Sequence, residues 1–202
     1  MVISTIVTGV GGQGVVSTSD VIANMAYLNG FDVKKSDVHG MAQRGGAVIS
    51  TVRFGEKVFS PIIDFDTADS LIALEELEGL RGVNYLKDNG ILILSNYHMP
   101  TPDITLGYTS YPDDIKERIR EIKPHILVYD IDVQGMLKRH PSYRDNMFLL
   151  GIYAKLLKYE KSLWLSAIEQ RFKNPDNPAN SFLYGYENKD ALVKSGTVGV
   201  EK

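Results

Sequence analysis

Apolar runs alternate with helix-like patterns through the first fifty residues. Residues 2–8 form a β-branched run that ends in glycines, which is typical of a buried parallel strand. From 12 to 28 the apolar positions follow the spacing of a helix packed on that strand, and Asn29-Gly30 is a common C-terminal stop. Residues 31–38 then predict a second strand, so the chain opens as β-α-β.

The next segment predicts a hairpin. Residues 47–53 and 57–59 are two short β-type runs on either side of the glycine-bearing turn Phe54-Gly55-Glu56. Two such runs around a turn of this kind favour antiparallel pairing, and Ser60-Pro61 would close the hairpin.

Alternation of helix and strand resumes after this segment. The patterns predict strands at 70–74, 91–94 and 126–130, and helices at 75–86, around Ile115, Ile119 and Ile122, at 146–159 and at 162–172. An Asn- and Pro-rich stretch follows at 174–178. We therefore predict an α/β fold of three layers, with a mainly parallel sheet, a Rossmann-like start, a β-hairpin insertion and a helical C-terminal extension. Residues 1–187 are expected to form one domain and 188–202 a flexible tail.

Composition removes several classes of function. Twenty-two basic and 25 acidic residues are interspersed and give a net charge of -3, so no basic block is present to capture nucleic acid. The absence of cysteine excludes disulfides, cysteine nucleophiles and cysteine-ligated iron–sulfur clusters in this chain. The apolar N-terminus lacks a basic segment and is broken by glycines, so we expect neither a signal peptide nor a membrane span, and a cytoplasmic protein.

The first glycine-rich turn, residues 9–14, fits the pattern G-x-G-x-x-G between a strand and a helix. Such a turn lets a phosphate approach the helix N-terminus. In dinucleotide-binding proteins an acidic residue about 20 positions further along the sequence holds a ribose, and Asp32 and Asp37 lie in that range. One hypothesis is therefore an NAD-binding oxidoreductase, and another is a nucleotide-sensing module. Against both, a loop and a predicted hairpin follow the second strand, where a Rossmann half would continue β-α-β. The glycines would then serve only close packing or the approach of a partner.

The second glycine-rich loop, His39-Gly40-Met41-Ala42-Gln43-Arg44-Gly45-Gly46, is dense in polar chemistry. Arg44 could pair with a carboxylate or phosphate, and His39 could titrate near neutral pH. The simpler interpretation is a hydrogen-bonded turn histidine and an arginine that ties the loop to Asp37. The other histidines are scattered, so the sequence shows no metal-ligand spacing and no catalytic triad. We predict no catalytic and no metal-binding residue in this chain.

The two glycine motifs, taken in their order along the chain, resemble the motifs of a known family. Residues 9–15 and 39–48 are similar to the gamma-type subunit of 2-oxoacid:ferredoxin oxidoreductases, and the H-G-M-A-Q-R-G-G loop is most similar to that of the indolepyruvate oxidoreductase beta subunit. Further similar segments are 52–55, 60–61, 68–69, 146–151 and 180–185. The resemblance covers about residues 3–187.

The resemblance implies a subunit that holds no cofactor itself. In this family thiamine diphosphate attacks the 2-oxoacid, carbon dioxide leaves, and electrons pass through iron–sulfur clusters to ferredoxin while coenzyme A takes the acyl group. Thiamine diphosphate, magnesium and the clusters are expected on large partner subunits, which also connect this chain to ferredoxin. The isolated chain is expected to be inactive, and it could homodimerise through a surface built for a partner.

Both glycine-rich loops are expected at one edge of the sheet, because the two strands before them would end there if parallel. They would face the thiamine-binding subunit or the entry of coenzyme A. The expected cofactor-binding or partner-facing residues are Gly9, Gly11, Gly12, Gln13, Gly14, His39, Gln43, Arg44, Gly45 and Gly46.

Overall fold

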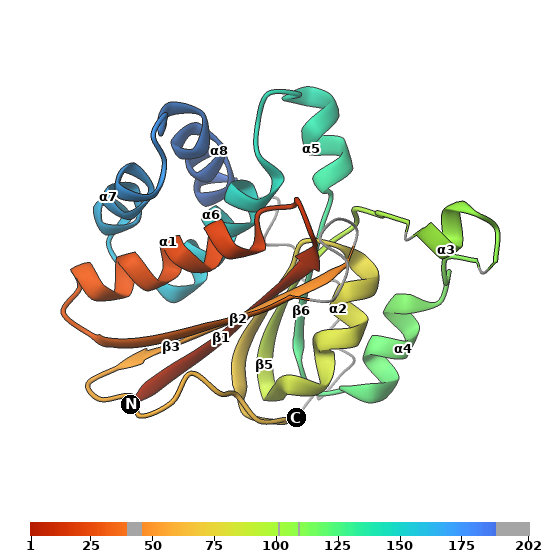
Figure 1. Ribbon diagram of the computed structural model, residues 1–202, viewed down its shortest axis with the longest axis horizontal. Coiled ribbons are helices and arrows are strands. Elements are labelled where there is room, and N and C mark those ends of the chain that lie inside the picture. The colour runs from red at the N-terminus through yellow and green to blue at the C-terminus, as the bar shows by residue number, and fades with distance from the viewer. Residues whose placement is uncertain (40–45, 101, 109, 189–202) are drawn as a thin grey trace, which may run out of the picture.

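A six-stranded mixed sheet forms the centre of the protein (Figure 1). The computed structural model describes residues 1–39, 46–100, 102–108 and 110–188. The strands are β1 (Val2–Val10), β2 (Asp32–His39), β3 (Ala47–Gly55), β4 (Ala68–Ala73), β5 (Leu86–Ser95) and β6 (Leu127–Ile131). The sheet order is β2-β3-β1-β4-β5-β6, in which β1, β4, β5 and β6 are parallel neighbours and β3 is antiparallel to both β1 and β2.

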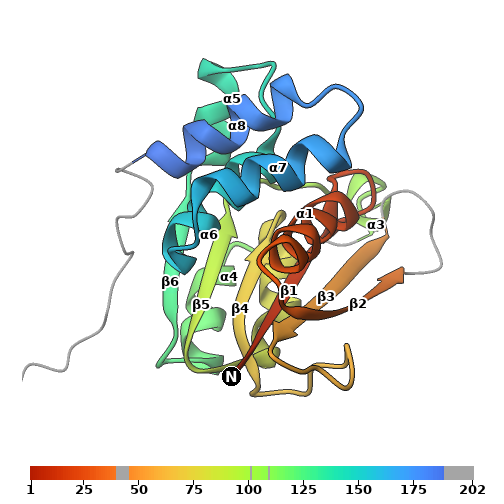
Figure 2. The same ribbon diagram turned by 90° about the vertical axis from the view of Figure 1, so that its left-hand side faces the viewer.

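Helices cover both faces of this sheet, which confirms the three-layer α/β fold (Figures 1 and 2). The helices are α1 (Val15–Leu28), α2 (Glu76–Gly82), α3 (Pro102–Thr105), α4 (Ile115–Ile122), α5 (Val133–Arg139), α6 (Asp145–Leu157), α7 (Lys161–Arg171) and α8 (Asp176–Glu187), with a 3-10 turn at Val83–Tyr85. One hydrophobic core lies between the sheet and α1, α5, α6, α7 and α8. A second core lies on the opposite face, under α2 and α4. None of the helices in the described ranges combines the length and apolar character needed to cross a bilayer.

The predicted strand pairing at the start of the chain needs correction. Residues 31–38 do form a strand, but β3 lies between it and β1, so the β-α-β opening does not make neighbouring parallel strands. The antiparallel hairpin is built by β2 and β3, joined by the second glycine-rich loop. The predicted pairing of 47–53 with 57–59 is wrong, because β3 already uses one edge for β1 and the other for β2.

The C-terminal extension contains more helix than the sequence pattern predicts. Residues 176–187 form α8, although the Asn- and Pro-rich stretch at 174–178 is typical of an irregular tail. Pro178 lies in the first turn of α8, where the missing N–H has no helical partner to lose. Phe182 is fully buried against Trp164, so tertiary packing stabilises a helix that its own propensity does not favour.

A buried hydroxyl cluster joins the sheet to α6. The Tyr153 hydroxyl lies 2.6 Å from Thr5 Oγ1, which in turn lies 3.0 Å from Ser70 Oγ. Burial raises the pKa of Tyr153 to about 12, against a usual value of about 10. The folded state therefore retains a proton that the unfolded chain loses first as the pH rises.

This cluster predicts a pH-dependent loss of stability at alkaline pH. The contribution of Tyr153 to the free energy of unfolding is present in full below pH ~10, the pKa of the unfolded chain. It disappears as the pH rises toward ~12, and the free energy of unfolding then falls by about 2 kcal/mol. Urea unfolding of the wild type and Tyr153→Phe across this range should give a steeper decline for the wild type. Equal slopes for the two proteins would contradict the assignment.

Candidate functional site

The first glycine-rich turn connects β1 to α1 and rests on the loop before β3. Gly14 is the N-cap of α1 and adopts a left-handed conformation, with φ 85°, and Gly12 has φ 105°. The Gly11 N–H donates to the Gly46 carbonyl at 2.9 Å. This bond shows that the two glycine-rich segments meet at one edge of the sheet, as the strand directions require.

Gln13 points into the protein from this turn. Its Oε1 accepts a hydrogen bond from the Val10 N–H at 2.7 Å, and its Nε2 donates to the Leu74 carbonyl at 3.0 Å. Helices leave β1 and β4 toward opposite faces of the sheet, so the ends of these two strands are the place where an open α/β sheet usually binds a ligand. The Gln13 side chain fills this crevice and joins its two sides.

A cleft of about 710 Å³ lies beside the turn, on the side of α1. It is lined by Val10, Gly11, Gly12, Gly14, Val15, Val16, Ser17, His39, Val48 and Arg171. The first turn of α1 has no acidic residue and its N-cap makes no side-chain hydrogen bond, so the positive end of the helix dipole faces the cleft. The cleft therefore suits an anionic group.

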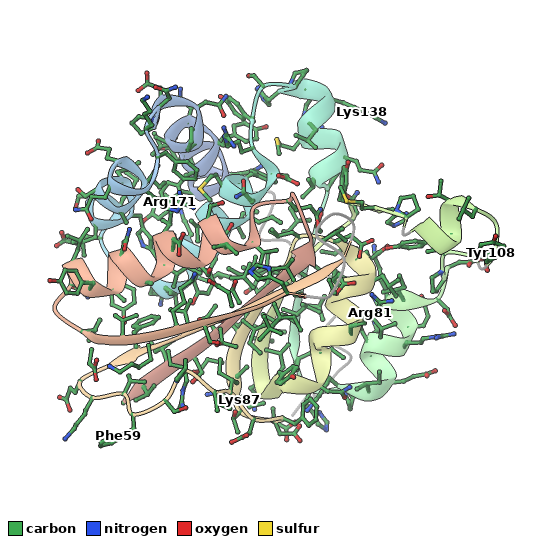
Figure 3. All side chains as sticks on the ribbon, in the orientation of Figure 1. Phe59, Arg81, Lys87, Tyr108, Lys138 and Arg171 are labelled. Carbon is green, nitrogen blue, oxygen red and sulfur yellow. The ribbon has the colours of Figure 1, made fainter. Side chains whose placement is uncertain are left out.

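Arg171, near the end of α7, adds a positive charge to this cleft. Its Nε donates to Asp20 Oδ2 at 2.7 Å, and the side chain is 38% exposed. Figure 3 shows Arg171 between α7 and the α1 layer. No local pattern in the sequence marks Arg171 as a site residue, because it lies 157 positions beyond Gly14, the last residue of the turn (171 − 14).

Asn146 fixes the shape of the turn from the second residue of α6. Its Nδ2 lies 3.3 Å from the Gly14 carbonyl oxygen and 3.2 Å from Thr18 Oγ1. Ser17 and Thr18 also donate to the Gly14 carbonyl, each at 2.9 Å. The N-terminus of α1 is thus positioned by the C-terminal helical extension.

The expected site residues fall into four groups. Gly11, Gly12, Gly14 and His39 line the cleft, Gly46 supports it through Gly11, and Gly9 and Gln13 pack inward. Gln43, Arg44 and Gly45 lie outside the described residues. The two loops are therefore brought together wherever the structure describes them.

The two acidic residues expected near a ribose are both held in contacts within the protein. Asp32 lies beside Gly55 at the end of the sheet where β1 begins, opposite the glycine-rich turn. Asp37 accepts hydrogen bonds from Ser50 at 2.6 Å and Lys35 at 2.7 Å. Burial opposes its ionisation, but these bonds outweigh burial and lower the pKa of Asp37. In the described structure both carboxylates are thus engaged by other groups of the protein.

A second polar cluster occupies the carboxyl ends of β4, β5 and β6. The buried Glu75 carboxylate accepts hydrogen bonds from the Tyr111 hydroxyl at 2.6 Å and from the Glu78 N–H at 2.9 Å. Burial and the nearby Glu75 charge raise the pKa of Tyr111. Glu76 lies 2.5 Å from His98 Nε2 and lines a cleft of about 400 Å³. Sequence reasoning missed this cluster because its members come from three separate segments.

The described residues contain no group of three or more histidine, aspartate or glutamate side chains that could hold a metal ion.

Comparison with protein families gives a match over nearly the whole chain. The model of the pyruvate ferredoxin/flavodoxin oxidoreductase family matches residues 4–187. The chain belongs to this family.

Curated relatives within the family carry one name repeatedly. The chain is 40% identical over 129 residues to the indolepyruvate oxidoreductase subunit IorB of Archaeoglobus fulgidus, covering 63% of this chain and 64% of that protein. The chain spans less than two thirds of the length of the first curated relatives that it matches, 58% and 64%.

Solved structures of two ferredoxin oxidoreductases show the same fold. The gamma subunit of a keto/oxoacid ferredoxin oxidoreductase from Geobacter sulfurreducens matches with a TM-score of 0.68 at 20% identity, over 96% of this chain and 99% of that one. A 2-oxoglutarate:ferredoxin oxidoreductase chain from Magnetococcus marinus matches with a TM-score of 0.70 at 20% identity, over 94% of this chain and 31% of that chain. The oxidoreductase fold therefore occurs both as a separate subunit and as part of a longer chain.

Proposed function

We propose that this chain is the small subunit of a 2-oxoacid:ferredoxin oxidoreductase that oxidatively decarboxylates a 2-oxoacid, with indolepyruvate or another arylpyruvate as substrate, to an acyl-CoA. The family match over residues 4–187 is the observation that carries the proposal. The 40% identity to an indolepyruvate oxidoreductase subunit supports the arylpyruvate branch. The match ends at the last residue of α8, which supports 187 as the domain boundary and 188–202 as a tail.

The cofactors of this reaction are proposed to lie on large partner subunits, through which the chain would connect to ferredoxin. There thiamine diphosphate with magnesium would supply the decarboxylation chemistry, and iron–sulfur clusters would take the electrons. The chain has no cysteine with which to ligate such clusters. In the Magnetococcus enzyme a domain of this fold is 31% of a larger chain whose structure contains coenzyme A. This supports a role packed against other domains, with coenzyme A as co-substrate.

The cleft beside the glycine-rich turn is the proposed contribution of this chain. The N–H groups at the start of α1 and the Arg171 guanidinium suit a phosphate of coenzyme A or a carboxylate of the partner subunit. Arg44, on the loop that follows His39, would add a second positive charge. The glycines would let the anionic group approach the backbone.

Reconstitution with its large subunit tests this function. The chain, co-expressed with that subunit under anaerobic conditions, should co-purify with thiamine and iron and show arylpyruvate-dependent reduction of ferredoxin. A chain that purifies alone with a bound nucleotide, and with neither thiamine nor iron, would instead support a nucleotide-binding protein.

The proposed anion-binding role is tested by removing the two positive charges assigned to it. Arg44→Ala and Arg171→Ala should each raise the KM for coenzyme A about tenfold, since a charge-assisted hydrogen bond contributes about 1.5–3 kcal/mol. Arg81→Ala, which removes an exposed arginine paired with Glu78 on α2, is the matched control and should leave the KM unchanged. An unchanged KM and unchanged assembly in both cleft variants would refute this role for the cleft.

A further inference from the structure

Four charged side chains and one hydroxyl form a network beside the cleft. The Arg171 Nε donates to Asp20 Oδ2 at 2.7 Å, and Lys35 Nζ lies 2.7 Å from Asp20 Oδ1. Lys35 Nζ also donates to Asp37 Oδ2 at 2.7 Å, and the Ser50 hydroxyl donates to Asp37 Oδ1 at 2.6 Å. The formal charges of the two cations and the two carboxylates cancel within the network.

The network connects the same elements that form the walls of the cleft. Its members come from α7, α1, β2 and β3, and α1 packs against α7 and against the β2–β3 hairpin (Figure 2). The cleft is lined by the first turn of α1, His39 of β2, Val48 of β3 and Arg171 at the end of α7. Side chains two positions apart on a strand share a face, so His39 lies on the same face of β2 as Lys35 and Asp37. The walls of the cleft are therefore joined by charged side chains.

The Arg171 guanidinium is held at one edge only. Asp20 accepts from its Nε–H, and its Cζ lies 5.6 Å from the centre of the Phe172 ring. Its two Nη groups make no hydrogen bond or ion pair with any residue that the structure describes. The Nη groups supply four further N–H donors, with which an arginine can bind a carboxylate or phosphate through two bonds. The side chain is thus fixed while donors remain available to a ligand.

Lys35 prevents the Asp20 carboxylate from serving Arg171 alone. Each cation takes a different oxygen of this carboxylate, so its negative charge is shared between them. The Lys35 side chain is 18% exposed and the Asp20 side chain 27%, which shields their contact from water in part. Isolated surface ion pairs hold their members weakly, whereas a network of several charges can keep them in one geometry.

We propose that Asp20 is a positioning residue, which holds the Nε edge of Arg171 so that the two Nη groups face an oxyanion bound in the cleft. Without Asp20, the arginine side chain would lose its conformational freedom only when the anion binds, and this entropy cost would weaken binding. A direct charge effect has the opposite sign, because a carboxylate repels an anion. The proposal rests on the anion-binding role proposed for the cleft.

Calorimetric titration of the purified full chain with pyrophosphate tests the proposal without requiring catalysis. Asp20→Ala should raise the dissociation constant of pyrophosphate about fivefold and Arg171→Ala about tenfold. The double variant should bind no more weakly than Arg171→Ala alone, because Asp20 acts only through the arginine.

Asp114→Ala is the matched control for the loss of a carboxylate. Asp114 Oδ2 lies 2.9 Å from Arg118 Nε on α4, which covers the opposite face of the sheet. This variant should leave the dissociation constant of pyrophosphate unchanged.

Three results would overturn the positioning role. They are a wild type that binds no pyrophosphate, an Asp20→Ala variant that binds it as tightly as the wild type or more tightly, and a double variant weakened about fiftyfold, the product of the two single effects. A reconstituted complex that fails to reduce ferredoxin would instead count against the proposed function, so the two failures are distinguishable.

The reconstituted complex identifies the source of the oxyanion. If it is a phosphate of coenzyme A, Asp20→Ala should raise the KM for coenzyme A about fivefold and leave kcat unchanged. If it is a carboxylate of the partner, the dissociation constant of the large subunit should rise by the same factor. A complex in which Arg171→Ala raises either constant and Asp20→Ala raises neither would also overturn the proposal.

Discussion

Gly151→Ala is expected to lower the free energy of unfolding by about 4 kcal/mol, because it forces two packed helices apart. A Cβ at Gly151 would overlap the carbonyl oxygen of Phe182 on α8, and a Cβ at Gly185 would overlap that of Phe148 on α6. Both obstructing atoms belong to helical backbone, which cannot rotate away. The effect is measured by urea unfolding followed by circular dichroism.

Two further variants show that the obstacle is the helix–helix contact. Gly185→Ala should cost about as much as Gly151→Ala, yet the double variant should cost clearly less than the sum, because the first substitution already separates the helices. Gly135→Ala is the control: its Cβ would meet only the Asp132 carboxylate, a side chain that can turn away at the loss of one cap of about 1 kcal/mol. If Gly151→Ala and Gly185→Ala each lowered the free energy of unfolding by less than ~1 kcal/mol, the close packing of α6 on α8 would be contradicted.

Gly14→Ala is expected to lower the free energy of unfolding by about 3 kcal/mol and to distort the cleft. The residue has φ 85°, and an added Cβ would overlap Nδ2 of Asn146. Asn146 is itself buried and joined to Thr18, so it has little freedom to yield. The binding of an anionic ligand should weaken together with stability, because the same turn positions the start of α1.

Gly30→Ala separates strain from overlap in this comparison. Gly30 has nearly the same backbone angle, φ 82°, but nothing lies within 4 Å of its Cβ position. Gly30→Ala should therefore lower the free energy of unfolding only by the cost of a left-handed backbone at a residue with a Cβ, about 1 kcal/mol. If Gly14→Ala and Gly30→Ala lowered the free energy of unfolding equally, the Asn146 side chain would be able to move away from the added Cβ without loss of stability.

The hydrophobic pattern predicted most elements of this protein. Strands β1, β4 and β6 and helices α1, α4, α6 and α7 agree with the predicted ranges to within a few residues, and β5 agrees in its second half, because buried strands and amphipathic helices leave a local periodic signal. The apolar residues 147–150 of α6 are all buried. Helix α8 was missed because its stability comes from packing against α6 and α7.

The candidate site was predicted in part. The two glycine-rich loops were expected at one edge, and the Gly11–Gly46 hydrogen bond joins them there. Gln13 was expected to face a ligand or partner, whereas both ends of its amide are bonded inside the protein. A side chain's direction depends on which backbone groups surround it, and one of these groups, the Leu74 carbonyl, lies 61 positions from Gln13 along the chain.

The fold class, the family and the glycine-rich turn follow from the sequence alone, since local spacing and residue type specify each of them. The strand order, the closing of the β1–β4 crevice by Gln13, and the approach of Arg171 and Asn146 to the turn become visible only when the chain is folded. These features join segments distant along the chain, and their geometry is set by which edge of a strand is free and which helix face is left to bury.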